Sequence, residues 1–158
     1  MRNIFIFLLI IISCSEFDNK NIKVQAPIPT SINSFFNEKP EIIKLDLTSS
    51  SQIDSWAQMI GFTEKFSDLF EKEINHKSKI KLLSTELDKI KKETIPRKYK
   101  TSPIIGRIRV VNTYLQKIDS YLLNQQNLEG YIIDLENLVE SYNGLIFQIN
   151  LVSKQIEN

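Results

Sequence analysis

The distribution of proline is the strongest constraint on what this chain can fold into. Three of its five prolines precede residue 48, and the other two, Pro96 and Pro103, lie close together in the middle of the remaining sequence. Between residues 48 and 94, Gly61 is the only glycine. Proline and glycine both disfavour helix interiors, so segments without them are free to form long helices. Such sparse turn residues exclude a β-sandwich, which needs many turns.

An apolar repeat predicts a first long helix over about residues 51–94. Alternate steps of three and four from Met59 give ten positions, and eight of these are apolar. This heptad spacing is typical of helices packed side by side. The two exceptions, Glu73 and His76, are interpreted as polar interruptions of one continuous contact line. The apolar members are Met59, Phe62, Phe66, Leu69, Ile80, Leu83, Leu87 and Ile90.

Local signals set the ends of the predicted helices. Ser49 and Gln52 have the spacing of a capping box at the start of the first helix. Pro96 predicts that this helix stops one residue earlier, because its ring disfavours the α conformation of the preceding residue. Ser102 as N-cap, with Pro103 in the first helical position, predicts that a second helix begins there.

The second helix is predicted over about residues 103–156. Its apolar pattern runs to Leu122 and resumes at Leu128, one residue out of phase, across the stretch NQQN. One continuous helix with a local slip is favoured, and two helices meeting near 124–130 are the alternative. Because the connection 95–102 is short, the two helices should be antiparallel neighbours. The predicted fold is therefore all-α, an elongated, coiled-coil-like antiparallel helical hairpin over residues 48–158.

Residues 14–47 are predicted to form a mostly irregular tether in front of the hairpin. They contain Pro27, Pro29 and Pro40, with several asparagines around them. The stretch EIIKLDL alternates apolar and charged residues, and it is interpreted as an extended segment packed along a helix. Three further apolar residues of the tether are candidates for docking on the helical body: Ile32, Phe35 and Phe36.

The first thirteen residues have the pattern of a signal peptide. Arg2 supplies a positive charge, and the apolar run 4–12 comes directly after Asn3. A bilayer-spanning helix needs about 20 apolar residues, so this run is too short to span. Its length fits a secretory signal of roughly 7–15 apolar residues. The chain is therefore expected to be exported.

The residues that end this segment, Ile11-Ile12-Ser13-Cys14, resemble the lipobox of bacterial lipoproteins. The resemblance implies cleavage before Cys14, a diacylglycerol on its thiol and an acyl chain on the new amino terminus. Two or more acyl chains give stable membrane anchoring. The alternative is an ordinary signal peptide with an incidental cysteine. Since Cys14 is the only cysteine, its acylation would leave no thiol for a disulfide, a metal or a nucleophilic role.

The resemblance also implies a location in the bacterial cell envelope, with the outer membrane favoured. Ser15-Glu16-Phe17-Asp18 resembles the short acidic export tag of surface-exposed lipoproteins in some Gram-negative bacteria. A plain polar start to a tether is an equal alternative. The periplasmic and surface faces of the membrane therefore both stay open.

Composition and motifs give no sign of catalysis. The chain has 20 basic and 19 acidic residues, and loss of Arg2 with the signal leaves 19 of each. This balance gives no support to nucleic-acid binding, which usually needs a basic excess. Phosphate loops, nucleophile elbows and zinc motifs are absent from the sequence. His76 is the only histidine, so neither an enzyme, a metal site nor a cofactor is predicted.

Charge is polarised along the predicted hairpin. No acidic residue occurs between Thr94 and Ile118, whereas no basic residue occurs between 119 and 153. The basic residues near the hairpin tip form a candidate anion- or partner-binding site: Arg97, Lys98, Lys100, Arg107 and Arg109, with Lys117 further along. The predicted function is a lipid-anchored interaction or scaffold module with a protein partner or self-association. The alternative is a lipoprotein that binds an anionic envelope component at this tip.

Overall fold

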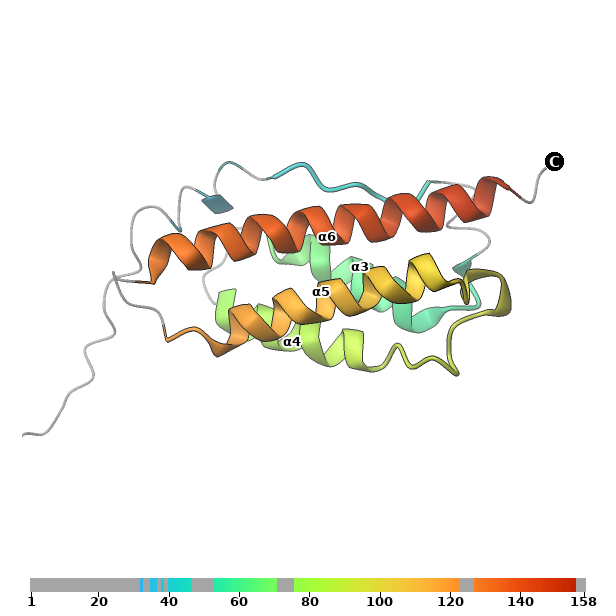
Figure 1. The fold of residues 1–158 in the computed structure, drawn as a ribbon, viewed down its shortest axis with the longest axis horizontal. Helices are drawn as coiled ribbons and strands as arrows, with labels where there is room; N and C mark the ends of the chain where they lie inside the picture. Colours follow the sequence, from blue (N-terminus) through green and yellow to red (C-terminus); the bar gives the residue numbers. More distant parts are fainter. Residues whose placement is uncertain are drawn as a thin grey trace, which may run out of the picture.

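The computed structural model describes residues 32, 35–36, 38, 40–46, 53–70, 76–122 and 127–155. Within these residues the chain is all-α, which confirms the predicted fold class (Figure 1). The helices with described bounds are α3 (Ala57–Asp68), α4 (His76–Asp88), α5 (Ser102–Ser120) and α6 (Leu128–Lys154), with a short 3-10 helix, η1 (Arg97–Tyr99), between α4 and α5. The signal peptide, Cys14 and the Ser49–Gln52 capping box lie outside the described residues.

The first predicted long helix, 51–94, is two helices. α3 ends at Asp68 and α4 begins at His76, and the two pack against each other. The end of α3 is closed by a cation, because Lys79 Nζ donates to the Asp68 carbonyl over 2.6 Å. α4 ends at Asp88, and a turn that buries Ile90 and Ile95 replaces the predicted last helical turns. His76, one of the two polar residues in the apolar repeat, is thus the first residue of a separate helix, and Glu73 lies outside the described residues.

The second predicted long helix, 103–156, is also two helices, so the favoured continuous helix is wrong and its alternative is correct. α5 stops at Ser120 because Tyr121 takes an extended conformation, with φ −66° and ψ 127°. α6 restarts after Asn127, whose side chain donates to the Leu122 carbonyl over 2.6 Å. The one-residue phase slip of the apolar pattern reflects this break.

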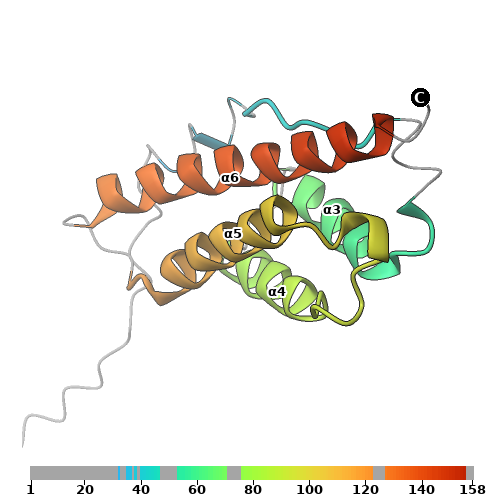
Figure 2. The ribbon, with the colours of Figure 1, turned by 45° about the vertical axis from the view of Figure 1, so that its right-hand side comes forward.

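The helices with described bounds form a bundle with alternating directions, in place of a single hairpin. α5 lies between α4 and α6 and packs on both, and α3 packs on α4 (Figure 2). Aromatic rings join α3 to α6. Phe66 stacks on Tyr142 with ring centroids 3.7 Å apart, and Phe62 lies 6.1 Å from the same ring. Each helix thus buries its apolar face against more than one neighbour, which a two-helix hairpin cannot provide.

The start of α5 differs from the prediction by one residue. Thr101 is the N-cap, and its hydroxyl accepts a hydrogen bond from the Ile104 amide over 3.5 Å. Ser102 is the first helical residue, and Pro103 stands in the first turn. The missing N–H of proline costs nothing in that position.

The described part of the predicted tether packs on the helices. Residues 40–46, named the strap from here on, run along α6 without regular secondary structure (Figure 1). Ile43 and Leu45 of the strap contact the core, and so does Phe35, while Ile32 and Phe36 are buried in it. The extended docking predicted for EIIKLDL is confirmed over residues 41–46. The strap is thus the part of the predicted tether that packs on the helices.

The connection between α4 and α5 is anchored by an inward-pointing ring. Tyr99 of η1 is fully buried, and its ring stacks on Trp56 with centroids 5.7 Å apart. Its hydroxyl shares a hydrogen bond of 2.9 Å with Ser153 Oγ, near the end of α6. The connection therefore contributes to the core at the end of the bundle where α5 begins and α6 ends.

Candidate interaction surface

Two asparagines on α6 hold the strap by its main chain. Asn143 accepts from the Ile43 amide over 2.8 Å and donates to the Glu41 carbonyl over 2.8 Å. Asn150 accepts from the Asp46 amide over 3.3 Å and donates to the Lys44 carbonyl over 3.1 Å. The two asparagines are seven positions apart, so both project from the same side of the helix. The strap consequently covers one flank of α6, and α5 covers the opposite flank.

Between these two flanks α6 shows an exposed line of side chains, which we call the outer stripe. Its members recur in steps of three and four and therefore share one face. Three large apolar residues of the stripe are open to solvent: Ile133 at 48%, Phe147 at 58% and Leu151 at 41%. The whole stripe comprises Ile133, Glu136, Glu140, Gly144, Phe147 and Leu151.

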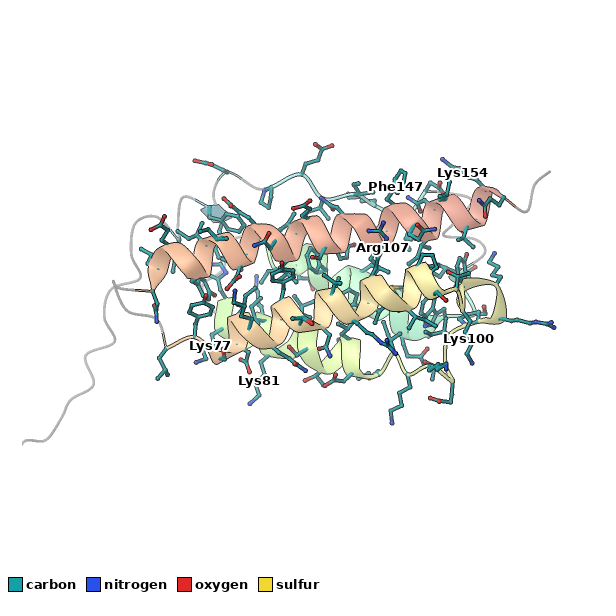
Figure 3. The ribbon with its side chains drawn as sticks, viewed as in Figure 1. Lys77, Lys81, Lys100, Arg107, Phe147 and Lys154 are labelled. Carbon is teal, nitrogen blue, oxygen red and sulfur yellow. The ribbon has the colours of Figure 1, made fainter. Side chains whose placement is uncertain are left out.

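Arg107 reaches the outer stripe from α5. A Cβ atom placed on Gly144 would lie 2.6 Å from Arg107 Nη1, so the guanidinium rests against the backbone of α6 at this glycine. Arg107 is exposed, and in Figure 3 it points towards α6 on the same half of the helix as Phe147 and Lys154. Arg109 follows two residues later on α5, at about 200° around the helix, and therefore projects from another side. The structure thus separates two residues that the sequence had grouped.

The other three basic residues of the predicted tip surround η1. Arg97 and Lys100 are exposed, and Lys98 is half-buried with its Nζ 4.7 Å from the centroid of the Tyr99 ring. All three belong to the end of the bundle where α5 starts and α6 finishes, which we call the basic end. Lys154 also lies at this end, where it pairs with Asp46 of the strap over 3.3 Å (Figure 3). The basic end is thus continuous with the outer stripe.

A groove of about 480 Å³ opens between the strap and α3. This volume is in the range of small-molecule sites. Tyr142 reaches it from α6, and burial raises the pKa of this tyrosine hydroxyl. The remaining polar side chains of its lining are at least partly exposed, so they leave the position of a ligand largely unconstrained. The lining comprises Lys44, Leu45, Ile53, Asp54, Ile60, Thr63, Glu64, Ser67, Asp68 and Tyr142.

His76, the only histidine, takes part in a cluster of rings. It is the first residue of α4, and its imidazole stacks on Phe36 with centroids 3.4 Å apart and planes within 3°. Burial lowers the pKa of His76, and the nearby positive charge of Lys79 lowers it further. The neutral imidazole therefore packs as an aromatic ring, in a role different from the polar interruption predicted for it.

A buried carboxylate joins α5 to α6. Asp134 is 2% exposed, and it accepts from Lys117 Nζ over 2.7 Å and from the Tyr121 hydroxyl over 2.6 Å. These hydrogen bonds raise the pKa of both donors. The Tyr131 ring meets the Tyr121 ring edge-on at 5.5 Å, and burial raises the Tyr131 pKa to about 12.

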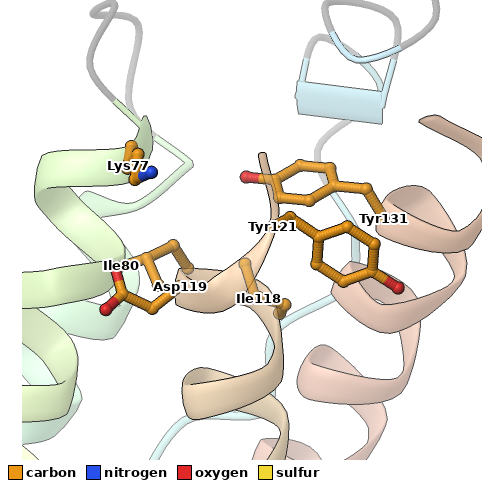
Figure 4. Close-up of a pocket in the computed structure, with 6 residues that line it drawn as sticks. All are labelled: Lys77, Ile80, Ile118, Asp119, Tyr121 and Tyr131. Carbon is orange, nitrogen blue, oxygen red and sulfur yellow. The ribbon is translucent and has the colours of Figure 1, made fainter. Parts of the chain in front are cut away.

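A small cavity of about 10 Å³ lies beside these rings, between α4 and the two C-terminal helices (Figure 4). This volume is about that of a single water-sized probe. It is lined by Lys77, Ile80, Ile118, Asp119, Tyr121 and Tyr131. Asp134 itself is therefore packed in the interior, whereas the side chain of Lys117 is 55% exposed. The cavity beside this contact is too small for a substrate.

Comparisons with known proteins give no further assignment. No family model matches the chain, and neither a curated protein nor a solved structure is significantly similar to it. Among the described residues, no three His, Cys, Asp or Glu side chains come together as a metal site. Of the helices that the structure describes, none has the length and apolar composition needed to cross a bilayer.

The outer stripe was not predicted from the sequence. The apolar pattern that resumes at Leu128 predicts one line of residues, and its later members are Ile132, Leu135, Val139, Tyr142, Ile146 and Ile149. Ile133 and Phe147 follow members of that line directly, and Leu151 is two residues beyond its last member. Apolar residues beside a complete buried line are the signal that a second face exists.

Proposed function

We propose that this protein is a lipid-anchored interaction module of the bacterial cell envelope, held through Cys14, that presents α5 and α6 to a protein partner. The observation that carries the proposal is the position of its exposed apolar and basic groups. Phe147, Leu151 and Arg107 belong to the half of the bundle that includes the basic end. Exposed large apolar residues flanked by charge are typical of protein–protein contact sites.

The direction of the chain supports this orientation. The described N-terminal residues begin beside the first turn of α4, where Phe36 meets His76, and the strap then leads along α6 towards the basic end (Figure 1). If the link from Cys14 to Ile32 is the flexible tether that the sequence predicts, its length of about 18 residues would give an end-to-end distance of roughly 25 Å. A helix as long as α6 extends about 40 Å. An anchored bundle standing on its N-terminal attachment would therefore hold the basic end away from the membrane.

The anchor is tested by changing Cys14 to Ala. We expect the variant to lack acyl chains and to leave the membrane fraction, because the lipid is the proposed source of membrane binding. Mass spectrometry and membrane fractionation measure the two effects. Unchanged membrane partitioning of the variant would rule out the lipid anchor.

The interaction surface is tested with a photocrosslinking residue at Phe147. In intact cells this position should capture a specific protein, whereas the same residue at Lys81, on α4, should not. Lys81 is a suitable control because it is exposed and lies on the far side of the bundle from α6 (Figure 3). Equal capture from both positions, or from neither, would argue against the proposed surface.

A second candidate function is the binding of an anionic envelope component at the basic end. It is supported by the gathering of Arg97, Lys98 and Lys100 around η1. Changing Arg97, Lys98 and Arg107 to Glu should abolish binding to anionic vesicles or phosphorylated glycans if this function holds. A protein partner that persists in this variant would favour the first function.

A further inference from the structure

We infer that the partner of the outer stripe is a second copy of this chain, with the two α6 helices packed antiparallel about a two-fold axis. The inference rests on the proposed function in that it uses the same surface, and it names what covers that surface. Three features carry it: the spacing of the apolar residues, the charge gradient along α6 and the stripe charges that the other described residues leave unpaired.

The spacing of the stripe suits helix–helix packing. Its six residues run from Ile133 to Leu151 in steps of three, four, four, three and four. This spacing places the side chains along one face, where they can pack against a neighbouring helix. The exposed apolar residues lie at both ends of the stripe, Ile133 at one and Phe147 with Leu151 at the other. An antiparallel pair brings these two ends together, so that Ile133 of each copy faces Leu151 of the other.

The charge gradient favours the same arrangement. Glu129, Glu136 and Glu140 are exposed in the first half of α6, and the second half has Arg107 lying over Gly144 and Lys154 near its end. Parallel helices would place the glutamates of the two copies beside each other. Antiparallel helices place each acidic half against the half that has Arg107, which is the complementarity that an isologous two-fold contact requires. Lys154 contributes less, because it already pairs with Asp46 of the strap.

Three charged residues near the middle of the outer stripe, Glu136, Glu140 and Arg107, form no ion pair with the described residues of the same copy. The ion pairs in that part of the chain join Lys65 to Asp68, Lys89 to Glu86, Lys117 to Asp134 and Lys154 to Asp46. Within the same described ranges, Glu136, Glu140 and Arg107 take part in none of them. If the two-fold axis that relates the two α6 helices passes between Glu140 and Gly144, then Glu140 of one copy faces Gly144 of the other. Glu140 thereby approaches the Arg107 that rests on that glycine.

The same features argue against a lipid surface as the occupant. An anionic membrane attracts cations, but it would repel the two glutamates that share the stripe with Phe147 and Leu151.

The size of the stripe predicts how strong the dimer is. The stretch from 133 to 151 is about 27 Å of helix. One face of a helix of this length buries less surface than the roughly 800 Å² that each partner contributes to a standard interface. Flanking residues therefore join the contact: Val110 of α5, which is 46% exposed, and Glu41 of the strap. We expect a dimer that dissociates on dilution.

Disulfide crosslinking tests the geometry. The full chain carrying Cys14→Ala has no other thiol, so single cysteines can be introduced at Ile133 or at Leu151. On oxidation in mild detergent, a mixture of the Ile133→Cys and Leu151→Cys chains should give a covalent dimer that joins one chain of each kind. Each variant alone should give far less. A mixture of Lys81→Cys and Leu151→Cys controls for crowding in the micelle and should not crosslink.

Charge exchange tests the chemistry. Glu140→Arg or Arg107→Glu alone should weaken the dimer about tenfold or more in Kd, measured by sedimentation equilibrium. The double variant, with both changes, should recover dimerisation. Every position changed in these two tests is exposed apart from Cys14, which lies outside the described residues. Circular dichroism checks that each variant keeps its helices.

The results separate this inference from the proposed function. A chain that stays monomeric at every concentration, or one that crosslinks mainly between identical cysteines, overturns the antiparallel dimer. If that chain still captures another envelope protein from Phe147 in cells, the proposed function stands without the dimer. If it captures nothing, both are wrong.

Discussion

Between α3 and α4 the chain turns beside a cluster of rings, whereas between α5 and α6 it turns beside a buried carboxylate. In the first region Phe70 contacts Phe36 and Phe35 with centroids 5.7 and 6.3 Å away, and His76 stacks on Phe36. Two of these four rings come from the N-terminal segment, which precedes α3. The packing of the first pair of helices therefore depends on a remote part of the chain.

The second region is self-contained. Asp134, Lys117 and Tyr121 all belong to α6, α5 or the residue that ends α5, so the contact needs nothing from elsewhere. Burying a carboxylate is costly unless its oxygens are bonded, and here two donors bond them. In both regions two packed helices stand where the sequence pattern also fits one long helix. The α3–α4 pair is stabilised by buried apolar area, and the α5–α6 pair is stabilised by specific polar contacts.

The largest effect should come from the ring cluster, in which Phe70 is 7% exposed. Phe70→Ala should lower the free energy of unfolding by about 3 kcal/mol, because it leaves a cavity among other aromatic residues. Urea denaturation measures the change. The matched control is Leu82→Ala on α4, where the leucine is 43% exposed. Its loss should cost about 0.5 kcal/mol or less. Equal losses for the two variants would contradict the role of the cluster.

Removal of the buried carboxylate should come next. Asp134→Ala should cost about 2 kcal/mol, because the two donors lose a charged acceptor and a partly filled space remains. The triple change Asp134→Leu, Lys117→Met and Tyr121→Phe removes all three polar groups together. It should regain much of the lost stability, because no buried polar group is then left without its partner. A triple variant weaker than Asp134→Ala would show that the polar groups matter for more than their mutual contacts.

Release of the strap should act on one region only. Asn143→Ala combined with Asn150→Ala removes four hydrogen bonds to the strap main chain. These bonds are partly exposed, so we expect a total loss of about 1 kcal/mol. Hydrogen exchange should rise in the strap and in the first turn of α4, where Phe36 packs. Faster exchange around Tyr131 as well would show that the two regions are coupled.

The smallest effect should be a dependence on pH through His76. Its pKa in the folded protein lies below the usual value of 6.5, so the unfolded chain binds the proton more readily. The stabilisation is therefore complete above pH 6.5 and is lost as the pH falls towards the folded pKa. Urea unfolding between pH 7.5 and 5 should show this decline. His76→Phe keeps the stacked ring and should be flat over the same range; a parallel decline would assign the dependence to other groups.

The helical class, the connection near Pro96 and the docking of the strap were all readable from the sequence. The two internal breaks were present as weaker signals. Glu73 and His76 interrupted one apolar line, and a phase slip interrupted the other, but each pattern also fits a continuous helix. The choice between them depends on contacts between distant segments, such as Phe66 with Tyr142 and Phe36 with His76. Local patterns carry no information about such pairs.

The candidate surface was only half predictable. Charge along the chain indicated a basic end, since the sign of a side chain can be read from the sequence. The two-residue spacing of Arg107 and Arg109 in a predicted helix already implies that they diverge. The charge pattern did not show that Gly144 lets Arg107 rest on α6. The exposure of Phe147 depends on which face of α6 the other helices and the strap leave open. That is decided by the packing of the whole bundle.

The asparagine contacts to the strap affect which substitutions the strap tolerates during evolution. Asn143 and Asn150 bond amide and carbonyl atoms of the strap. Every residue except proline supplies both of these atoms. The exposed side chains of Glu41 and Lys44 are not held by these bonds. Substitution there can change the charge and shape of the surface while the backbone path stays the same. The side chains of the strap can thus change the charge and shape of this surface with little effect on the fold of the bundle.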